Sequence, residues 1–137
     1  GRFQYLNKGK IKNKLHRNEI IMIDGAHAST DAQNLAAYLK NIKIPKYGIW
    51  AMTKNKEPDL FIKQLKGVFK KIVTMPIENE YNSVPACELY KIASKNKLIA
   101  EKSGNFTEAL NRISSREKKL IVCFGSLYNC GNILNKN

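Results

Sequence analysis

Short apolar runs alternate along this chain with segments whose apolar residues recur at helical spacing, and this alternation limits the fold more than any other feature. The runs are typical of buried strands, and the segments between them of amphipathic helices. Strands that alternate with helices form a mainly parallel sheet covered on both faces, with right-handed crossovers. The sequence therefore predicts an α/β domain of the three-layer, Rossmann-like type. We expect its strands at 19–23, 47–52, 71–75, 98–101 and 119–124.

The predicted helices between these strands are marked by capping residues and prolines. Thr30 begins a Thr-x-x-Gln pattern that is typical of a capping box. Pro58 opens a second helix, and Pro85 stands near the start of a third. The strongest helical pattern is 105–116, with Asn105 as its N-cap.

The chain is strongly basic, with 24 Lys and Arg residues against 11 Asp and Glu and a net charge of +13. Such a charge is often found in nucleic-acid-binding domains. However, only four basic residues are arginine, and the densest basic stretch, 8–14, carries no aromatic residues on which bases could stack. We interpret 8–14 as a solvated loop within a mobile hairpin at 7–18, and the charge as a general attraction for small anions. A stand-alone nucleic-acid-binding module stays the alternative.

Several classes of protein are excluded by what the sequence lacks. No apolar run approaches the length of a membrane span, and the first residues do not resemble a signal peptide. Three cysteines without close spacing, beside only two histidines, make a structural zinc site unexpected. We therefore expect a cytoplasmic protein with reduced thiols and no metal site of its own.

Polar residues follow several of the predicted strands, at the edge where ligands bind in open parallel sheets. Asp24 could accept hydrogen bonds from a ribose diol, and Ser126 at a helix start suits a carboxylate or phosphate. Lys56 would add a point charge. Each feature also has a structural interpretation: Asp24 as a turn cap, His27 as an ordinary loop histidine, and Ser126 as a plain N-cap.

Familiar catalytic motifs are missing from this edge. The chain has no Gly-x-Ser-x-Gly elbow around Ser126, no G-x-G-x-x-G after its first predicted strand, and no P-loop of the form G-x-x-x-x-G-K-[ST]. These absences favour ligand binding over nucleophilic catalysis. A phosphate-cradling loop would have to come from elsewhere.

Three motifs, taken in order, resemble one family. Gly1-Arg2-Phe3-Gln4, Asp24-Gly25-Ala26-His27 and Gly125-Ser126-Leu127-Tyr128 are similar to signatures of folylpolyglutamate synthase and the bifunctional dihydrofolate synthase. The resemblance covers essentially the whole chain and corresponds to the C-terminal glutamate-ligase domain of the Mur ligase superfamily. It implies one domain over 1–137 that follows, in cis, an ATP-binding P-loop domain absent from this chain.

The resemblance implies an ATP-dependent amide ligase. In the family, a dihydropteroate or reduced folate carboxylate takes the γ-phosphoryl group of ATP to form an acyl phosphate, which the amine of L-glutamate then attacks. ATP and Mg²⁺ are the implied cofactors, with the metal ligands on the preceding domain. A monomer without nucleic-acid partners is expected.

The same resemblance assigns roles to five residues. Arg2 would reach the ATP phosphates from the interdomain hinge, and Asp24 would hold the ribose hydroxyls. His27 would be catalytic, at the point where the triphosphate meets the incoming glutamate. Ser126 would bind a glutamate carboxylate, and Lys56 would add positive charge there.

Three departures from the family pattern bear on these roles. The chain has Ala28-Ser29 where the family usually has Asn-Pro, Asn55 where it has aspartate, and Asn129-Cys130 where it has an apolar pair. A working but divergent enzyme is the interpretation that we favour, and an inactive remnant is the alternative.

Because nothing in this chain can cradle the β- and γ-phosphates, we expect no ATP turnover from the 137 residues alone. A coupled assay of ADP release, with and without L-glutamate, measures this directly. Glutamate-dependent ATP hydrolysis by the isolated chain would contradict the assignment of the phosphate site to another domain.

Overall fold

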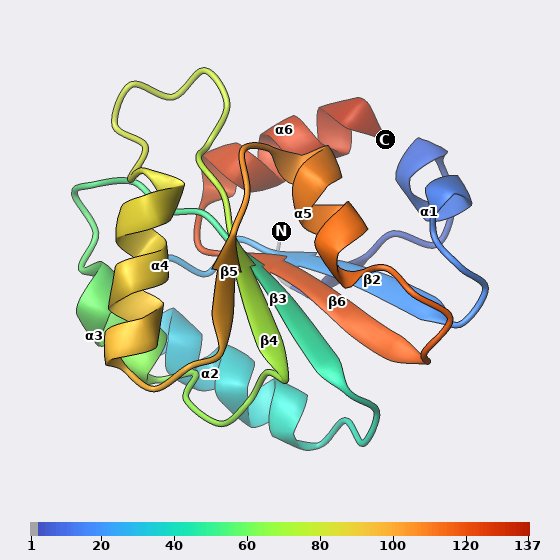
Figure 1. Ribbon diagram of the computed structural model, residues 1–137, viewed down its shortest axis with the longest axis horizontal. Coiled ribbons are helices and arrows are strands. Elements are labelled where there is room, and N and C mark those ends of the chain that lie inside the picture. Colours follow the sequence, from blue (N-terminus) through green and yellow to red (C-terminus); the bar gives the residue numbers. More distant parts are fainter. Residues whose placement is uncertain (1–2) are drawn as a thin grey trace.

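A computed structural model describes residues 3–137, which form a six-stranded sheet with helices on both faces (Figure 1). The strand order is β1-β2-β6-β3-β4-β5, with β1 antiparallel to β2 and all other neighbours parallel. This confirms the predicted α/β class. The elements are β1 (Gln4–Tyr5), α1 (Lys10–Lys14), β2 (Glu19–Asp24), α2 (Ser29–Lys40), β3 (Lys46–Trp50), α3 (Pro58–Lys63), β4 (Lys71–Thr74), α4 (Ala86–Lys95), β5 (Ala100–Lys102), α5 (Phe106–Ile113), β6 (Lys119–Phe124) and α6 (Leu127–Lys136).

The two faces of the sheet carry separate apolar cores. Helices α2, α3 and α4 cover one face, and α1, α5 and α6 cover the other. Strand β6 lies between β2 and β3 and is buried along its whole length. Its side chains alternate, so that Val122 and Phe124 pack beneath α2 and α3 while Ile121 and Cys123 pack beneath α5 and α6.

The prediction of a hairpin at 7–18 is wrong. Residues 10–14 form the short helix α1, in which Ile11 is buried beside α5. The C-terminal residue holds this helix: the backbone N–H of Lys10 donates to the carbonyl of Asn137 at 3.2 Å, and that of Ile11 to Asn137 Oδ1 at 3.1 Å. The basic run is therefore fixed by a contact from the other end of the chain.

The structure also differs from the sequence analysis at three other places. Helix α2 begins before Thr30, and the carboxylate of Asp31 caps it by accepting from the backbone N–H groups of His27 and Ala28 at 3.3 and 3.2 Å. In α3, Phe61 and Ile62 are buried, whereas Leu60 is exposed. The strand β1 was not predicted at all.

Other predictions hold. The side chain of Asn105 accepts from the backbone N–H of Glu108 at 2.8 Å and caps α5, which ends at Ile113. Pro58 occupies the first position of α3, and Pro85 immediately precedes α4. Within residues 3–137, no helix is both long and apolar enough to cross a membrane.

A buried ion pair joins the first residues of β2 and β6. The ammonium of Lys119 lies 2.9 Å from the Glu19 carboxylate, and neither side chain is exposed. Burial alone would raise the pKa of Glu19, but hydrogen bonds from Ser114, Lys119 and the neighbouring backbone outweigh it and hold that pKa below its ordinary value. The pair is thus fully satisfied at the amino edge of the sheet.

Replacing Lys119 by methionine leaves the Glu19 charge buried without its cation. We expect Lys119→Met to lower the free energy of unfolding by about 3–5 kcal/mol in urea denaturation. Lys70→Met, which breaks the exposed pair with Glu117, is the control and should cost less than about 1 kcal/mol.

The same pair predicts a pH dependence. Since the pKa of Glu19 is lowered on folding, its contribution is complete above the ordinary pKa of glutamate and is lost as the pH falls through the lower, folded value. Equal losses of stability in Lys119→Met and Lys70→Met at neutral pH would contradict the account of the buried Glu19–Lys119 pair.

Candidate functional site

The carboxyl ends of three adjacent strands frame the site. Asp24, Phe124 and Trp50, the last residues of β2, β6 and β3, lie in register across the sheet. The loops that follow them enclose a cleft of about 290 Å³. The side chains that line it are His27, Thr53, Lys56, Gly125, Ser126, Leu127 and Tyr128. Three of the predicted site residues are therefore brought together here.

A second cleft, of about 170 Å³, adjoins the first, since His27 and Lys56 line both. Ala28, Ser29 and Asn55 also line it, so two of the three departures from the family pattern fall at this point. Asn55 is held in place because its side-chain oxygen accepts a hydrogen bond from the Thr53 hydroxyl at 2.8 Å. The two clefts therefore meet at His27 and Lys56, at the carboxyl edge of the sheet.

Gly125 makes the turn from β6 into this site. Its φ is +107°, a conformation that side chains with a Cβ rarely adopt. A Cβ at this position would lie only 2.2 Å from the carbonyl oxygen of Ala51 and 2.7 Å from the Trp50 ring. Only glycine allows β6 to approach β3 this closely, and this approach places the start of α6 at the cleft.

Ser126 is the N-cap of α6. Its Oγ accepts hydrogen bonds from the backbone N–H groups of Tyr128 and Asn129, at 3.1 and 3.3 Å. The structural interpretation of this serine is therefore confirmed. Its oxygen is engaged as an acceptor, which leaves the hydroxyl proton as the group that could donate to a ligand. Binding of a glutamate carboxylate by Ser126 stays a prediction.

His27 is held with a defined tautomer. Its Nδ1 lies 2.8 Å from the carbonyl oxygen of Gly25, which can only accept, so the neutral ring carries its proton on Nδ1. Nε2 is then the acceptor nitrogen. The side chain is one-third exposed, and Nδ1 is also 3.9 Å from the carboxylate of Asp31. Such a ring can accept a proton from a group bound in the cleft.

Asp24 does not line the cleft. Asp24 ends β2 as predicted, but its side chain is fully buried and does not line either cleft. Burial raises the pKa of the nearby Cys130 thiol to about 11, and the Asp24 carboxylate adds to this rise. Arg2 lies outside the described residues, so its role and the ribose contact of Asp24 stay predictions.

Sequence reasoning missed three residues of the cleft. Thr53 follows β3 closely and is nearly buried, while Leu127 and Tyr128 are exposed in the first turn of α6. Their positions in the sequence could have identified them, because each of the three follows a strand that ends at this edge of the sheet. The cleft thus combines an apolar wall from Leu127 and Tyr128 with the positive charge of Lys56 and the start of a helix.

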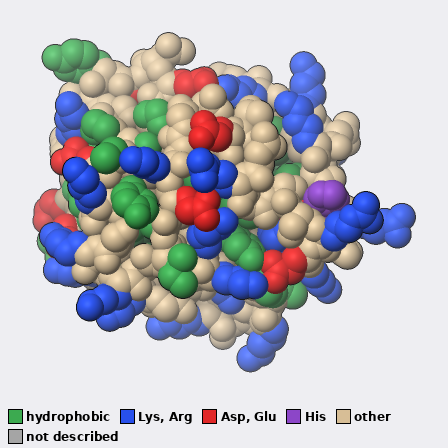
Figure 2. Space-filling view, viewed as in Figure 1, with side chains coloured by type: hydrophobic (Ala, Val, Ile, Leu, Met, Phe, Trp, Pro, Cys, Tyr) green, Lys and Arg blue, Asp and Glu red, His purple; other side chains and the backbone are tan. Residues whose placement is uncertain are grey.

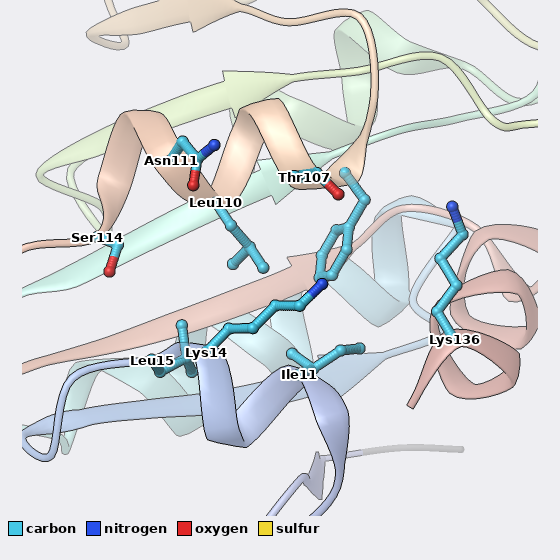
Figure 3. A pocket seen from close by; sticks show the side chains of 9 residues that line it. Ile11, Lys14, Leu15, Thr107, Leu110, Asn111, Ser114 and Lys136 are labelled. Atoms are coloured by element: carbon cyan, nitrogen blue, oxygen red, sulfur yellow. The ribbon is translucent and has the colours of Figure 1, made fainter.

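A separate cavity of about 80 Å³ lies between α1 and α5 (Figure 3). Ile11 and Leu110 line it from α1 and α5, the side chain of Lys14 extends between these two helices, and Lys136 lines it from α6. It contains none of the predicted site residues. Within residues 3–137, no group of three His, Cys, Asp or Glu side chains could hold a metal ion.

The mainly parallel sheet, covered by helices on both faces and with clefts at its carboxyl edge, defines an α/β domain of the three-layer type. Residues 7–136 match the family model of the dihydrofolate synthetase C-terminal domain, and the chain belongs to that family. The comparison with curated proteins found no match.

Solved structures of three ligases share the fold. The bifunctional folylpolyglutamate synthase/dihydrofolate synthase of Yersinia pestis, complexed with AMPPNP and Mn, is 16% identical with a TM-score of 0.78 over 98% of this chain. Escherichia coli FolC with DHPP and ADP is 14% identical (TM-score 0.75, 88% of this chain). Mycobacterium tuberculosis folylpolyglutamate synthase with ADP and AMPPCP is 18% identical (TM-score 0.72, 85% of this chain). This chain spans 30%, 29% and 29% of those chains, respectively.

The turn at Gly125 can be tested with a matched pair of glycine substitutions. Gly125→Ala should lower the free energy of unfolding by about 2–5 kcal/mol, because the new methyl group meets the Ala51 carbonyl and the positive φ is strained. Gly131→Ala, in the open middle of α6, should raise it by about 0.5–1 kcal/mol. Thermal or urea unfolding measures both, and changes of the same sign would contradict the account of this turn.

Proposed function

We propose that this chain is part of an ATP-dependent ligase that adds L-glutamate to dihydropteroate, to reduced folate, or to both. The family match supports the ligase class, and the cleft at the strand ends supplies residues suited to anionic ligands. The relatives named above were solved with ADP or ATP analogues and with DHPP, and another structure of a bifunctional folylpolyglutamate synthase/dihydrofolate synthase contains L-glutamate. Their ligands belong to the same chemical classes as those proposed here.

The start of α6 is the proposed site for a glutamate carboxylate. The first turn of this ten-residue helix carries backbone N–H groups and the positive end of the helix dipole, both of which favour an anion. Lys56 borders the same cleft and would add a full positive charge. The Ser126 hydroxyl would donate its proton to the carboxylate while its oxygen continues to cap the helix.

His27 is the proposed catalytic residue. In the proposed reaction, the substrate carboxylate attacks the γ-phosphorus of ATP, and ADP leaves. The glutamate amine then attacks the acyl phosphate, inorganic phosphate leaves, and the amine must lose a proton. Nε2 of His27 is the acceptor nitrogen on the wall of the cleft, because Nδ1 is engaged with Gly25.

The remaining parts of the proposed enzyme lie outside this chain. The sequence has no P-loop. A P-loop domain that precedes it in cis would therefore bind the β- and γ-phosphates and would carry the protein ligands of Mg²⁺. Arg2 and Asp24 would contact the phosphates and the ribose from the hinge side. A cytoplasmic, monomeric enzyme completes the proposal.

The surface charge fits small anionic substrates better than nucleic acid. On the face shown in Figure 2, Lys and Arg side chains are spread over the surface with Asp and Glu between them, and they do not gather into one stripe. ATP, glutamate and polyglutamate tails would all be attracted by the net charge of +13. A nucleic-acid-binding module, which usually concentrates its charge along one face, is therefore the weaker alternative.

Ser126→Ala, made in the complete enzyme, should raise the KM for L-glutamate more than the KM for ATP. Loss of a hydrogen bond to a charged group predicts a rise of roughly ten-fold or more. Because the substitution also removes a helix cap, Asn105→Ala is the matched control: it removes the cap of α5, away from the cleft, at a similar cost in stability.

Steady-state measurements of ADP release at varied glutamate and varied ATP separate the two constants. Equal changes of KM in both variants would remove Ser126 from the glutamate site. An unmodified complete enzyme that forms no ADP with either dihydropteroate or reduced folate would contradict the proposed function itself.

A further inference from the structure

Three aromatic side chains fix the first described residues to the body of the domain. The ring of Phe3 stacks on that of Tyr38, in the last turns of α2, with centroids 4.3 Å apart and planes 9° from parallel. The hydroxyl groups of Tyr5 and Tyr38 lie 2.6 Å apart. All three rings are half-buried and pack against the core beneath α2. Tyr38 thus contacts two residues of the first segment in two different ways.

The backbone of this segment is held only weakly by the sheet. Strand β1 has two residues, which pair antiparallel with Met22 and Ile23 of β2. Among residues 3–137, one further ladder bond, from the backbone N–H of Leu6 to the carbonyl of Ile21 at 3.0 Å, continues the pairing. So short an edge strand is expected to fray unless side chains hold it.

Phe3 also adopts a conformation that needs support. Its φ is +50°, in the left-handed region that bulky residues rarely occupy. Backbone strain of this kind persists where the surrounding structure over-determines it, and it occurs often at functional sites. The stack on Tyr38 supports this conformation.

We propose that Tyr38 is a positioning residue that clamps Phe3 and Tyr5 and so fixes the place of Phe3 beside the carboxyl end of β2. The register places Gln4 opposite Ile23, so Phe3 follows the antiparallel pairing towards the edge of the sheet that carries the cleft. The catalytic part of this inference rests on the proposed function, because Phe3 directly follows Arg2, the proposed phosphate ligand.

The hydroxyl pair distinguishes a clamp from ordinary packing. If Tyr38 served only to bury apolar surface, its ring would be sufficient. Its hydroxyl, however, lies at hydrogen-bond distance from the hydroxyl of Tyr5. Burial raises the pKa of Tyr5 to about 12, and the bond with Tyr38 adds to the rise, so the Tyr5 hydroxyl stays protonated at neutral pH. The bond links α2 to β1.

Hydrogen exchange on the protein that carries this chain tests the clamp. Tyr38→Phe keeps the ring stack and removes the hydroxyl bond, so exchange in the peptide containing β1 should rise about five-fold. Tyr38→Ala removes both contacts and should raise it by more than about ten-fold. Tyr90→Ala, on α4 and outside the cluster, is the control and should leave this peptide unchanged. Unchanged exchange of β1 in a folded Tyr38→Ala protein would overturn the clamp.

Kinetics in the complete enzyme test the positioning role. Tyr38→Ala should raise the KM for ATP at least about five-fold, while Tyr38→Phe recovers most of the loss and Tyr90→Ala has no effect. Faster exchange of β1 without a change in the KM for ATP would overturn the positioning role. If the unmodified enzyme makes no ligase product, the proposed function fails, and the exchange data still decide whether Tyr38 clamps the segment.

Discussion

The close approach of β6 to β3 at Gly125 is the constraint on which the candidate site depends. The carbonyl of Ala51 occupies the space that a side chain at Gly125 would need. Because the two strands meet here without an intervening side chain, α6 begins directly at the cleft and Ser126 caps it there. The loop after β3 can then bring Lys56 to the same cleft, opposite His27 from the loop after β2.

The buried ion pair and the candidate site lie at opposite edges of the sheet. At the amino edge, Glu19 and Lys119 form a buried, fully hydrogen-bonded pair that links β2 to β6. At the carboxyl edge, the same strands end in a glycine turn and in polar loops that are open to solvent. In open α/β sheets, ligands bind beyond the carboxyl ends of the strands, which is the edge where the clefts of this domain lie.

The sequence predicted the sheet because buried strands and amphipathic helices leave strong periodic patterns. It also predicted three cleft residues, His27, Lys56 and Ser126, since each follows a strand that ends at one edge. Strand β1 was missed because two residues are too few for any alternation to be visible. Helix α1 was missed because Asn137, at the other end of the chain, holds it.

Other differences come from contacts and burial that a local sequence pattern does not show. Thr30 matched a capping pattern, but the Asp31 carboxylate, one residue later, bonds the free N–H groups before α2. Asp24 was placed correctly at the end of β2, yet neighbouring elements bury it completely, which no local pattern reveals. Ser126 was given two interpretations, and the structure confirms the cap without testing the contact with glutamate.

The most direct test of this account is a crystal structure of the complete protein with a non-hydrolysable ATP analogue and L-glutamate. The account predicts a glutamate carboxylate within hydrogen-bond distance of Ser126 and Lys56, at the start of α6, with the analogue reaching the cleft beside His27. Ligands bound elsewhere on this domain, such as the cavity between α1 and α5, with the cleft at the strand ends left empty, would contradict it.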